Sequence, residues 1–259
     1  MSHTHQAKAM LRHWLLATDR HSLHEPFAYN LYQNVIIDQD TDPDFSSIEQ
    51  IRSSYALKRQ KLDLQVLGAA SKQGKRSLRQ LALYGSTRPT YARMLYRLTR
   101  FMEVSNVIEL GTSLGLTSLY LSNDPGVKLL TLEGDPILIA QAKQQFEGMK
   151  RKNITIIGGN IDETFDEALH FSGSVDMIYF DANHRYEPTK HYFEKAKDYI
   201  HENSVLVFDD IHWSPEMTRA WNMIKNDRDV TMTVDLYQMG FVFFRPFRRK
   251  YNYLLEQRG

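Results

Sequence analysis

The chain of 259 residues contains no cysteine. This absence excludes disulfide bonds, thiolate metal sites and a cysteine nucleophile, and it fits a reducing compartment. Long apolar runs are also missing, because the longest one near the start, residues 14–17 (WLLA), is far too short for a signal sequence or a membrane span. We therefore expect a cytoplasmic protein that has no membrane partner.

The chain has almost no excess of charge of either sign. Its formal net charge is +1, and charged residues make up 24% of the chain. Such a balance creates no general electrostatic attraction for a polyanion. We therefore expect no nucleic-acid partner.

Two familiar nucleotide-binding motifs are missing as well. There is no G-x-G-x-x-G stretch, which disfavours an NAD-type oxidoreductase. Residues 68–76 (GAASKQGKR) look superficially like a phosphate loop, but five residues separate the glycines instead of four, and Arg76 stands where Ser or Thr should hold magnesium. Residues 77–80 (SLRQ) have the pattern of a capping box, so this stretch is predicted to be a basic connection entering a helix, with a lid role left open.

Residues 1–88 are predicted to form an N-terminal helical region. Short apolar groups recur there at mixed spacings, and a longer helix is expected near residues 46–67. His21 and His24 are three residues apart, but no second pair with zinc spacing follows, so a metal site is disfavoured. We expect this region to supply packing helices, a lid or the contact of a homodimer.

From residue 89 onward strands and helices alternate. After Pro89 an amphipathic helix is expected, with Tyr91, Leu95, Leu98 and Met102 on one face. The strands that follow are expected at residues 106–109, 127–132, 154–157, 175–181, 204–208, 231–236 and 240–244. This order predicts an α/β domain over residues 89–259, with a Rossmann-like, doubly wound sheet of seven strands whose last strand is antiparallel. The basic, aromatic tail, residues 245–258, is expected to be a solvated surface element.

The stretch 106–121 (NVIELGTSLGLTSLYL) organises this domain. A short apolar strand leads to Glu109, a loop runs from Gly111 to Gly115, and a helix begins near Leu116. That order places backbone N–H groups and the positive end of a helix dipole beside a ligand. Gly111 can adopt the positive φ of a turn that leaves a strand, and Gly115 has no Cβ to hold a ligand or a packed helix away. The loop is a candidate nucleotide-type cofactor site, although glycine turns also link strands to helices in any α/β domain.

An acid follows the second strand at a suitable distance from this loop. Glu133 lies 22 residues after Gly111. Asp135 can cap the next helix with Pro136 at its first position, which leaves Glu133 free at the strand end. A carboxylate about 20 residues beyond a glycine loop can accept hydrogen bonds from both hydroxyls of a ribose. Glu133 is therefore a candidate cofactor ligand, the alternative being an ordinary strand-end acid.

Further acids end the next two strands. Asp181 ends the fourth strand, and Asp209 and Asp210 end the fifth. Neighbouring parallel strands would bring these three carboxylates to one edge of the sheet, where they repel one another unless a cation or protons neutralise them. Mg²⁺ or Mn²⁺ would suit an all-oxygen site. Plain hydrogen-bonded carboxylates are the alternative.

These motifs together resemble a known family. The E-x-G-x-x-x-G pattern at Glu109 resembles motif I of the class I S-adenosylmethionine (SAM)-dependent methyltransferases. D-x-x-H-x-Y-E, residues 181–187, and D-D, residues 209–210, resemble the metal-assisted small-molecule O-methyltransferases, especially the macrocin type. The catechol and caffeoyl-CoA enzymes of that group carry lysine where His184 stands and asparagine where Asp210 stands. The resemblance extends over about residues 91–244.

The resemblance implies transfer of a methyl group from SAM to a hydroxyl of a small molecule. The residues that it implies as SAM contacts are Glu109, Gly111, Thr112, Ser113, Gly115, Thr117, Glu133, Asn160 and Asp181. The implied ligands of a divalent metal, Mg²⁺ or Mn²⁺, are Asp181, Asp209 and Asp210. His184, whose unperturbed pKa would be near 6.5, is the candidate general base beside Asp181, the alternative being a capping role.

Other readings of these motifs stay open. A SAM-binding protein without catalysis and a metal-independent methyltransferase acting on another acceptor both fit them. No Asn/Asp-Pro-Pro-aromatic sequence follows the fourth strand, so methylation of amino groups in nucleic acid is disfavoured. His212 and Trp213 could line the acceptor pocket or could pack.

Overall fold

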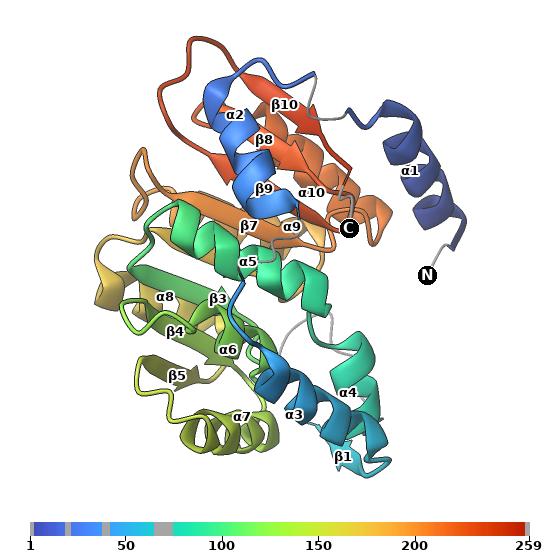
Figure 1. Cartoon of the computed structure of the whole chain (residues 1–259), viewed down its shortest axis with the longest axis vertical. Helices are drawn as coiled ribbons and strands as arrows, with labels where there is room; N and C mark the ends of the chain where they lie inside the picture. The colour runs from blue at the N-terminus through green and yellow to red at the C-terminus, as the bar shows by residue number, and fades with distance from the viewer. Residues whose placement is uncertain (1–2, 19–21, 38–41, 65–74, 257–259) are drawn as a thin grey trace.

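An eight-stranded sheet runs through the chain with helices on both of its faces (Figure 1). The computed structural model describes residues 3–18, 22–37, 42–64 and 75–256. The strand order is β10-β8-β9-β7-β6-β3-β4-β5. The strands are β3 (Asn106–Leu110), β4 (Lys128–Glu133), β5 (Ile154–Gly158), β6 (Met177–Phe180), β7 (Val205–Asp209), β8 (Met232–Asp235), β9 (Met239–Phe243) and β10 (Tyr251–Leu254).

The sheet confirms the predicted doubly wound fold. Strands β3 to β7 are parallel, and the order reverses at β3, which pairs with β4 on one side and with β6 on the other. Strand β9 is antiparallel to both β7 and β8, as expected for the closing pair. Ligands of such sheets bind beyond the carboxyl ends of the strands where the order reverses. The fold therefore puts the candidate site next to the ends of β3, β4 and β6.

One strand was not anticipated. The tail that we expected to be a solvated surface element contains β10, which pairs in parallel with β8, so the sheet has eight strands instead of seven. The pairing is supported by a side-chain bond of 2.7 Å from Thr233 to Asn252. Three basic residues, 248–250, stand directly before this edge strand and hide its short apolar pattern.

Alternate residues of the strands feed two apolar cores. Val107, Met177 and Val205 pack with α2 (Pro26–Leu31), η2 (Tyr32–Ile36) and α5 (Pro89–Phe101) on one face. Ile108, Ile178 and Leu206 pack on the opposite face, where the helices are α8 (Ile161–Ser172), α9 (Tyr186–Ala196) and α10 (Pro215–Asn226). This period of two is the one expected for strands that are covered on both sides.

A third core lies between the glycine-loop helix and the N-terminal region. It joins α6 (Leu116–Leu121) and α7 (Pro136–Gly148) to α3 (Ser46–Leu57) and α4 (Leu78–Tyr84). The helix starts follow the predicted caps: Asp135 accepts the N–H groups of Ile137 and Leu138, and Ser77 and Gln80 form the capping box that opens α4.

The N-terminal region differs from the prediction in two ways. Helix α3 ends at Leu57 instead of near residue 67, and β1 (Lys61–Asp63) pairs with β2 (Lys75–Ser77) as a two-stranded antiparallel ribbon. Three-residue strands of mostly charged residues carry no apolar alternation from which a ribbon could be predicted. The region begins with α1 (His3–Leu16). Residues 68–74 of the glycine-containing connection and His21 lie outside the described residues.

Within the ranges that the structure describes, no helix combines the length and the apolar character needed to cross a membrane.

Candidate active site

The glycine loop meets the end of β6. Gly111 has φ +100°, and a Cβ atom placed on it would lie 2.4 Å from the carbonyl oxygen of Asp181. A side chain at this position would therefore collide with rigid backbone as well as strain its own. The sequence prediction that the loop and Asp181 share one crevice agrees with this contact.

Gly115 is needed for packing of a helix. Its φ is +76°, and a Cβ atom there would lie 2.7 Å from the ring of Phe146 in α7. Of the two reasons proposed for this glycine, close packing of a helix is the one that the contacts support. Between the two glycines, Ser113 also has a positive φ of 51°. The loop thus turns tightly, with the N–H groups of Gly111 and Thr112 bonded to the carbonyl of Leu132 and that of Gly115 bonded to the carbonyl of Thr112.

Glu133 points back to this loop. One carboxylate oxygen accepts the backbone N–H of Ser113 at 2.8 Å, and the other accepts the N–H of Asp135 at 2.9 Å. Each oxygen retains lone-pair capacity for a further donor. Burial raises the pKa of Glu133, and the two backbone N–H groups oppose that rise. The side chain is thus fixed in orientation and able to accept from two ligand hydroxyls.

Glu109 is fully buried beneath the loop. One of its carboxylate oxygens accepts hydrogen bonds from the hydroxyls of Ser118 and, at 2.7 Å, of Thr131. The other oxygen has no hydrogen-bond partner among the described residues. Burial raises the pKa of Glu109 to about 8, against the effect of the two hydroxyls. The contacts of this carboxyl group are with α6 and β4, and its role as a cofactor contact stays a prediction.

The pKa of Glu109 makes stability depend on pH. A group with a raised pKa contributes stability that is fully present below its unfolded value, 4.5, and is lost as the pH rises through about 8. We expect Glu109→Gln to gain stability relative to the wild type over this range, by up to about 1.4 kcal/mol per pH unit. Urea unfolding at a series of pH values measures this difference. The exposed Glu147→Gln is the control and should track the wild type; a Glu109→Gln curve parallel to the wild type would contradict the assignment.

A buried chain of hydroxyls links the loop helix to the acids. Thr117 donates to Thr87 at 3.0 Å, Thr87 is 2.9 Å from the hydroxyl of Tyr179, and Tyr179 donates to Asp209 at 3.1 Å. Thr117 was predicted as a SAM contact, and in the structure its hydroxyl is hydrogen-bonded to that of Thr87. Sequence analysis missed Thr87 and Tyr179. The position of Tyr179, two residues before Asp181 on an otherwise apolar strand, was the available signal.

The other predicted contacts bond locally. Thr112 is buried, and its hydroxyl lies 2.6 Å from that of Thr131. Asn160 caps α8 by accepting the N–H of Asp162 at 3.2 Å. Asn183, which follows Asp181 closely, donates to Tyr192 at 2.7 Å and has a positive φ of 50°. The predicted contacts of Thr112 and Asn160 with SAM stay predictions.

Three acids and one histidine meet beyond β6 and β7. His184 Nε2 lies 3.5 Å from Asp181 Oδ1. Burial lowers the pKa of His184, but the hydrogen bond and charge of Asp181, followed by the charges of Asp210 and Asp209, outweigh it and raise the pKa to about 9. Burial raises the pKa of Asp209 well above its usual range, and the charges of Asp181 and Asp210 add to that rise. The protonated imidazole is thus the counter-charge of this acidic group.

The described side chains do not fit the divalent metal that was predicted. Among residues 3–18, 22–37, 42–64 and 75–256, no group of three or more His, Asp or Glu side chains is placed to hold an ion. Asp209 gives one oxygen to Tyr179, and its other oxygen is buried without a hydrogen-bond partner. Asp181 faces His184. The metal ligands Asp181, Asp209 and Asp210 stay a prediction.

His212 and Trp213 lie on the segment after Asp210. His212 bonds Asp235 at 3.0 Å, and Trp213 keeps 44% of its surface exposed. For His212 the packing alternative is the one that these contacts support. Asp210 itself has a positive φ of 53° and accepts the N–H of Trp213 at 2.9 Å, which turns the chain away from β7.

Part of the chain is similar to known proteins. Residues 108–211 match the model of a methyltransferase domain. An uncharacterized protein, R132, of Acanthamoeba polyphaga mimivirus is 27% identical over 162 residues, which make up 56% of this chain and 71% of that protein.

Solved methyltransferases have a similar fold. An O-methyltransferase from Bacillus cereus, in complex with S-adenosylhomocysteine (SAH), matches with a TM-score of 0.55 and 16% identity, over 83% of this chain and 96% of that one. The O-methyltransferase TomG from Streptomyces achromogenes, in complex with SAM, matches with a TM-score of 0.52 and 18% identity, over 62% and 82%. Residues 108–211 are therefore similar to a methyltransferase domain, and the chain shares the fold of these solved methyltransferases, in agreement with the resemblance found in the sequence.

Proposed function

We propose that this protein transfers the methyl group of SAM to a hydroxyl oxygen of a small molecule. The observation that carries the proposal is the contact of the glycine loop with the ends of β4 and β6. There Glu133 bonds the glycine loop, and the backbone of Asp181 contacts Gly111. The O-methyltransferase neighbours, one with SAM and one with SAH, support the choice of cofactor and of an oxygen acceptor.

Each residue has a definite task in this proposal. Glu133 would accept hydrogen bonds from both ribose hydroxyls, because a separate backbone N–H group orients each of its two oxygens. The start of α6 would face the polar end of the cofactor. Methyl transfer is an in-line displacement at carbon, so the main contribution of the crevice is to align the acceptor oxygen, the methyl carbon and the sulfur.

His184 is proposed to take the proton of the acceptor hydroxyl. Asp181, 3.5 Å away, would hold the ring in position and stabilise the imidazolium that forms. Thr87, which precedes α5, contributes to the same chain of hydroxyls, so the N-terminal region helps to shape the site. We propose that this region also lies over the acceptor.

The rate should rise with pH if His184 is the base. A pKa of about 9 leaves most of the imidazole protonated at neutral pH, and only the neutral ring accepts a proton. We expect kcat/KM to increase about tenfold per pH unit from pH 6.5 and to level off near pH 9. Initial rates across this range measure the profile. His184→Ala should be slower with a flat profile, whereas a wild-type profile that already levels near pH 6.5 would contradict the assignment.

Binding and turnover together test the proposed function. Calorimetry with SAM, SAH and NADH should give binding of SAM and SAH only, and binding of NADH alone would sink the proposal in favour of an oxidoreductase. Methyl transfer from SAM is then assayed over a broad library of hydroxylated molecules. Each assay is run with EDTA, with Mg²⁺ and with Mn²⁺, which tests the predicted metal separately. Binding of SAM without turnover on any acceptor would identify a SAM-binding protein without catalysis.

A further inference from the structure

A second cavity lies between the first helix and the end of the sheet, apart from the SAM crevice. Its volume is about 230 Å³, and its lining residues come from α1, α10, the ends of β8 and β10, and the segment after β7. Its lining is unusually basic, with His5, Lys8, Arg12, His13, His212 and Lys225. Residues 5, 8, 9, 12 and 13 fall on one face of α1, so this helix presents a single basic face to the cavity.

The cavity has fixed walls. His5 Nε2 lies 3.0 Å from the hydroxyl of Thr218 in α10, and Gln6 donates to the carbonyl of Trp213 at 2.9 Å. Tyr237 donates to the carbonyl of Gln6 at 3.0 Å, which ties the same turn of α1 to the loop after β8. These bonds come from both sides of the helix turn, so α1 is held at a defined distance from α10.

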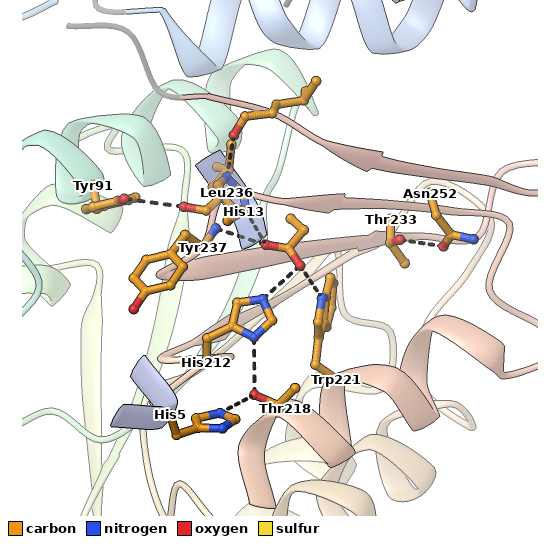
Figure 2. Close-up of polar contacts among 12 residues, drawn as sticks. His5, His13, Tyr91, His212, Thr218, Trp221, Thr233, Leu236, Tyr237 and Asn252 are labelled. Carbon is orange, nitrogen blue, oxygen red and sulfur yellow. Dashed lines mark hydrogen bonds and ion pairs between the residues drawn. The ribbon is translucent and has the colours of Figure 1, made fainter. Parts of the chain in front are cut away.

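The acid in the lining, Asp235, already accepts several hydrogen bonds. Asp235 accepts hydrogen bonds from His212 at 3.0 Å, from the indole of Trp221 at 2.8 Å and from the backbone of Tyr237 at 2.9 Å (Figure 2). His13 Nδ1 lies 3.3 Å from its other side. Its side chain is only 3% exposed. Asp235 therefore serves as the anchor of the wall and has no capacity left for the three long basic side chains.

Those three side chains have no carboxylate within ion-pair distance among the described residues. The ammonium group of Lys225 lies over the ring of Trp221, 5.8 Å from its centre. Burial lowers the pKa of Lys225; the charge of Asp235 opposes this, and the charge of Arg12 adds to it. Like charges thus face one another across a preformed space, an arrangement that a bound anion would stabilise.

We propose that this cavity binds a phosphate group, either as inorganic phosphate or as the phosphate of a small phosphomonoester. A dianion matches the uncompensated charge of Lys8, Arg12 and Lys225, and the amide of Asn222 supplies a further polar contact. The volume holds a phosphate and a few attached atoms but not a nucleotide. Because Lys8 and Arg12 come from α1 and Lys225 from α10, the anion would join the two helices.

Titration calorimetry on the full chain tests this site. Inorganic phosphate, glycerol 3-phosphate and acetate are compared at equal ionic strength, with wild type, the double variant Arg12→Gln/Lys225→Gln, and Lys190→Gln, an exposed lysine of α9, as the matched control. We expect one phosphate or phosphate ester per chain in the wild type and control, and binding at least about tenfold weaker in the double variant. Tighter binding of glycerol 3-phosphate would identify a phosphomonoester as the ligand, and tighter binding of inorganic phosphate would identify the free ion. No binding of either, equal binding by the double variant, or equal binding of acetate would overturn the proposal.

Two measurements separate loss of the site from loss of the fold. Without phosphate, the double variant should melt no lower than the wild type, because it removes like charges. Hydrogen exchange of the α1 amides should slow when phosphate is added to the wild type and stay unchanged in the double variant. If the double variant does not fold, Lys8→Gln, at an exposed position, replaces it in both measurements. Exchange in α1 that phosphate leaves unchanged in the wild type would also overturn the proposal.

Discussion

Replacing Glu133 by alanine is expected to weaken SAH binding about 100-fold or more, since hydrogen bonds to a charged group contribute about 1.5–3 kcal/mol each and Glu133 is proposed to accept two from the ribose. The backbone N–H groups of Ser113 and Asp135 orient the two carboxylate oxygens of Glu133. Titration calorimetry with SAH measures the loss. Glu133→Gln keeps an acceptor but not the charge, so its affinity for SAH should lie between those of the wild type and Glu133→Ala.

The control for this variant is Glu147→Ala, an exposed acid of the neighbouring helix α7. It should bind SAH as the wild type does. Thermal unfolding of each variant shows whether the fold is retained, because Glu133→Ala also leaves two backbone donors without their acceptor. A folded Glu133→Ala protein that binds SAH within about twofold of the wild type would contradict the assignment of the ribose contact.

Replacing Asp235 by alanine is expected to cause the largest loss of stability. The substitution removes the buried hydrogen-bond acceptor of three groups: the indole of Trp221, the imidazole of His212 and the N–H of Tyr237. Removing one partner of a buried charged network costs about 3–5 kcal/mol. Urea unfolding at neutral pH measures the loss, with the exposed Asp198→Ala as the control that should change stability by less than about 0.5 kcal/mol. A loss as small as that of the control would refute the anchoring role.

The stabilisation that Asp235 contributes is expected to be lost at low pH. Burial raises the pKa of Asp235, but the hydrogen bonds of His13 and His212 outweigh it and hold the pKa below its ordinary value of 3.8. A depressed pKa contributes stability that is present above the unfolded value and lost as the pH falls below it. The stability difference between wild type and Asp235→Ala should therefore narrow only below about pH 3.8.

Local patterns were sufficient to predict the elements around the candidate site. The strand, glycine loop and helix at residues 106–121, the cap at Asp135 and the position of Glu133 at the end of its strand all depend on a few neighbouring residues. The doubly wound order followed from the alternation of strands and helices in the same way.

Contacts between distant segments could not be predicted. Thr87 belongs to a region that we separated from the catalytic domain, yet it bonds Tyr179. The sequence analysis did not single out His5 and His13, whose partners in α10 and β8 lie near the other end of the chain. The full burial of Glu109 also depends on packing of the whole layer. Such pairings arise from tertiary packing, which no local periodicity encodes.

A crystal structure of the protein with SAH tests the central claim most directly. The account predicts SAH at the carboxyl ends of β3, β4 and β6, with both ribose hydroxyls on Glu133 and the rest of the ligand along the loop from Gly111 to Gly115. SAH bound elsewhere, or in this crevice with its ribose away from Glu133, would contradict it.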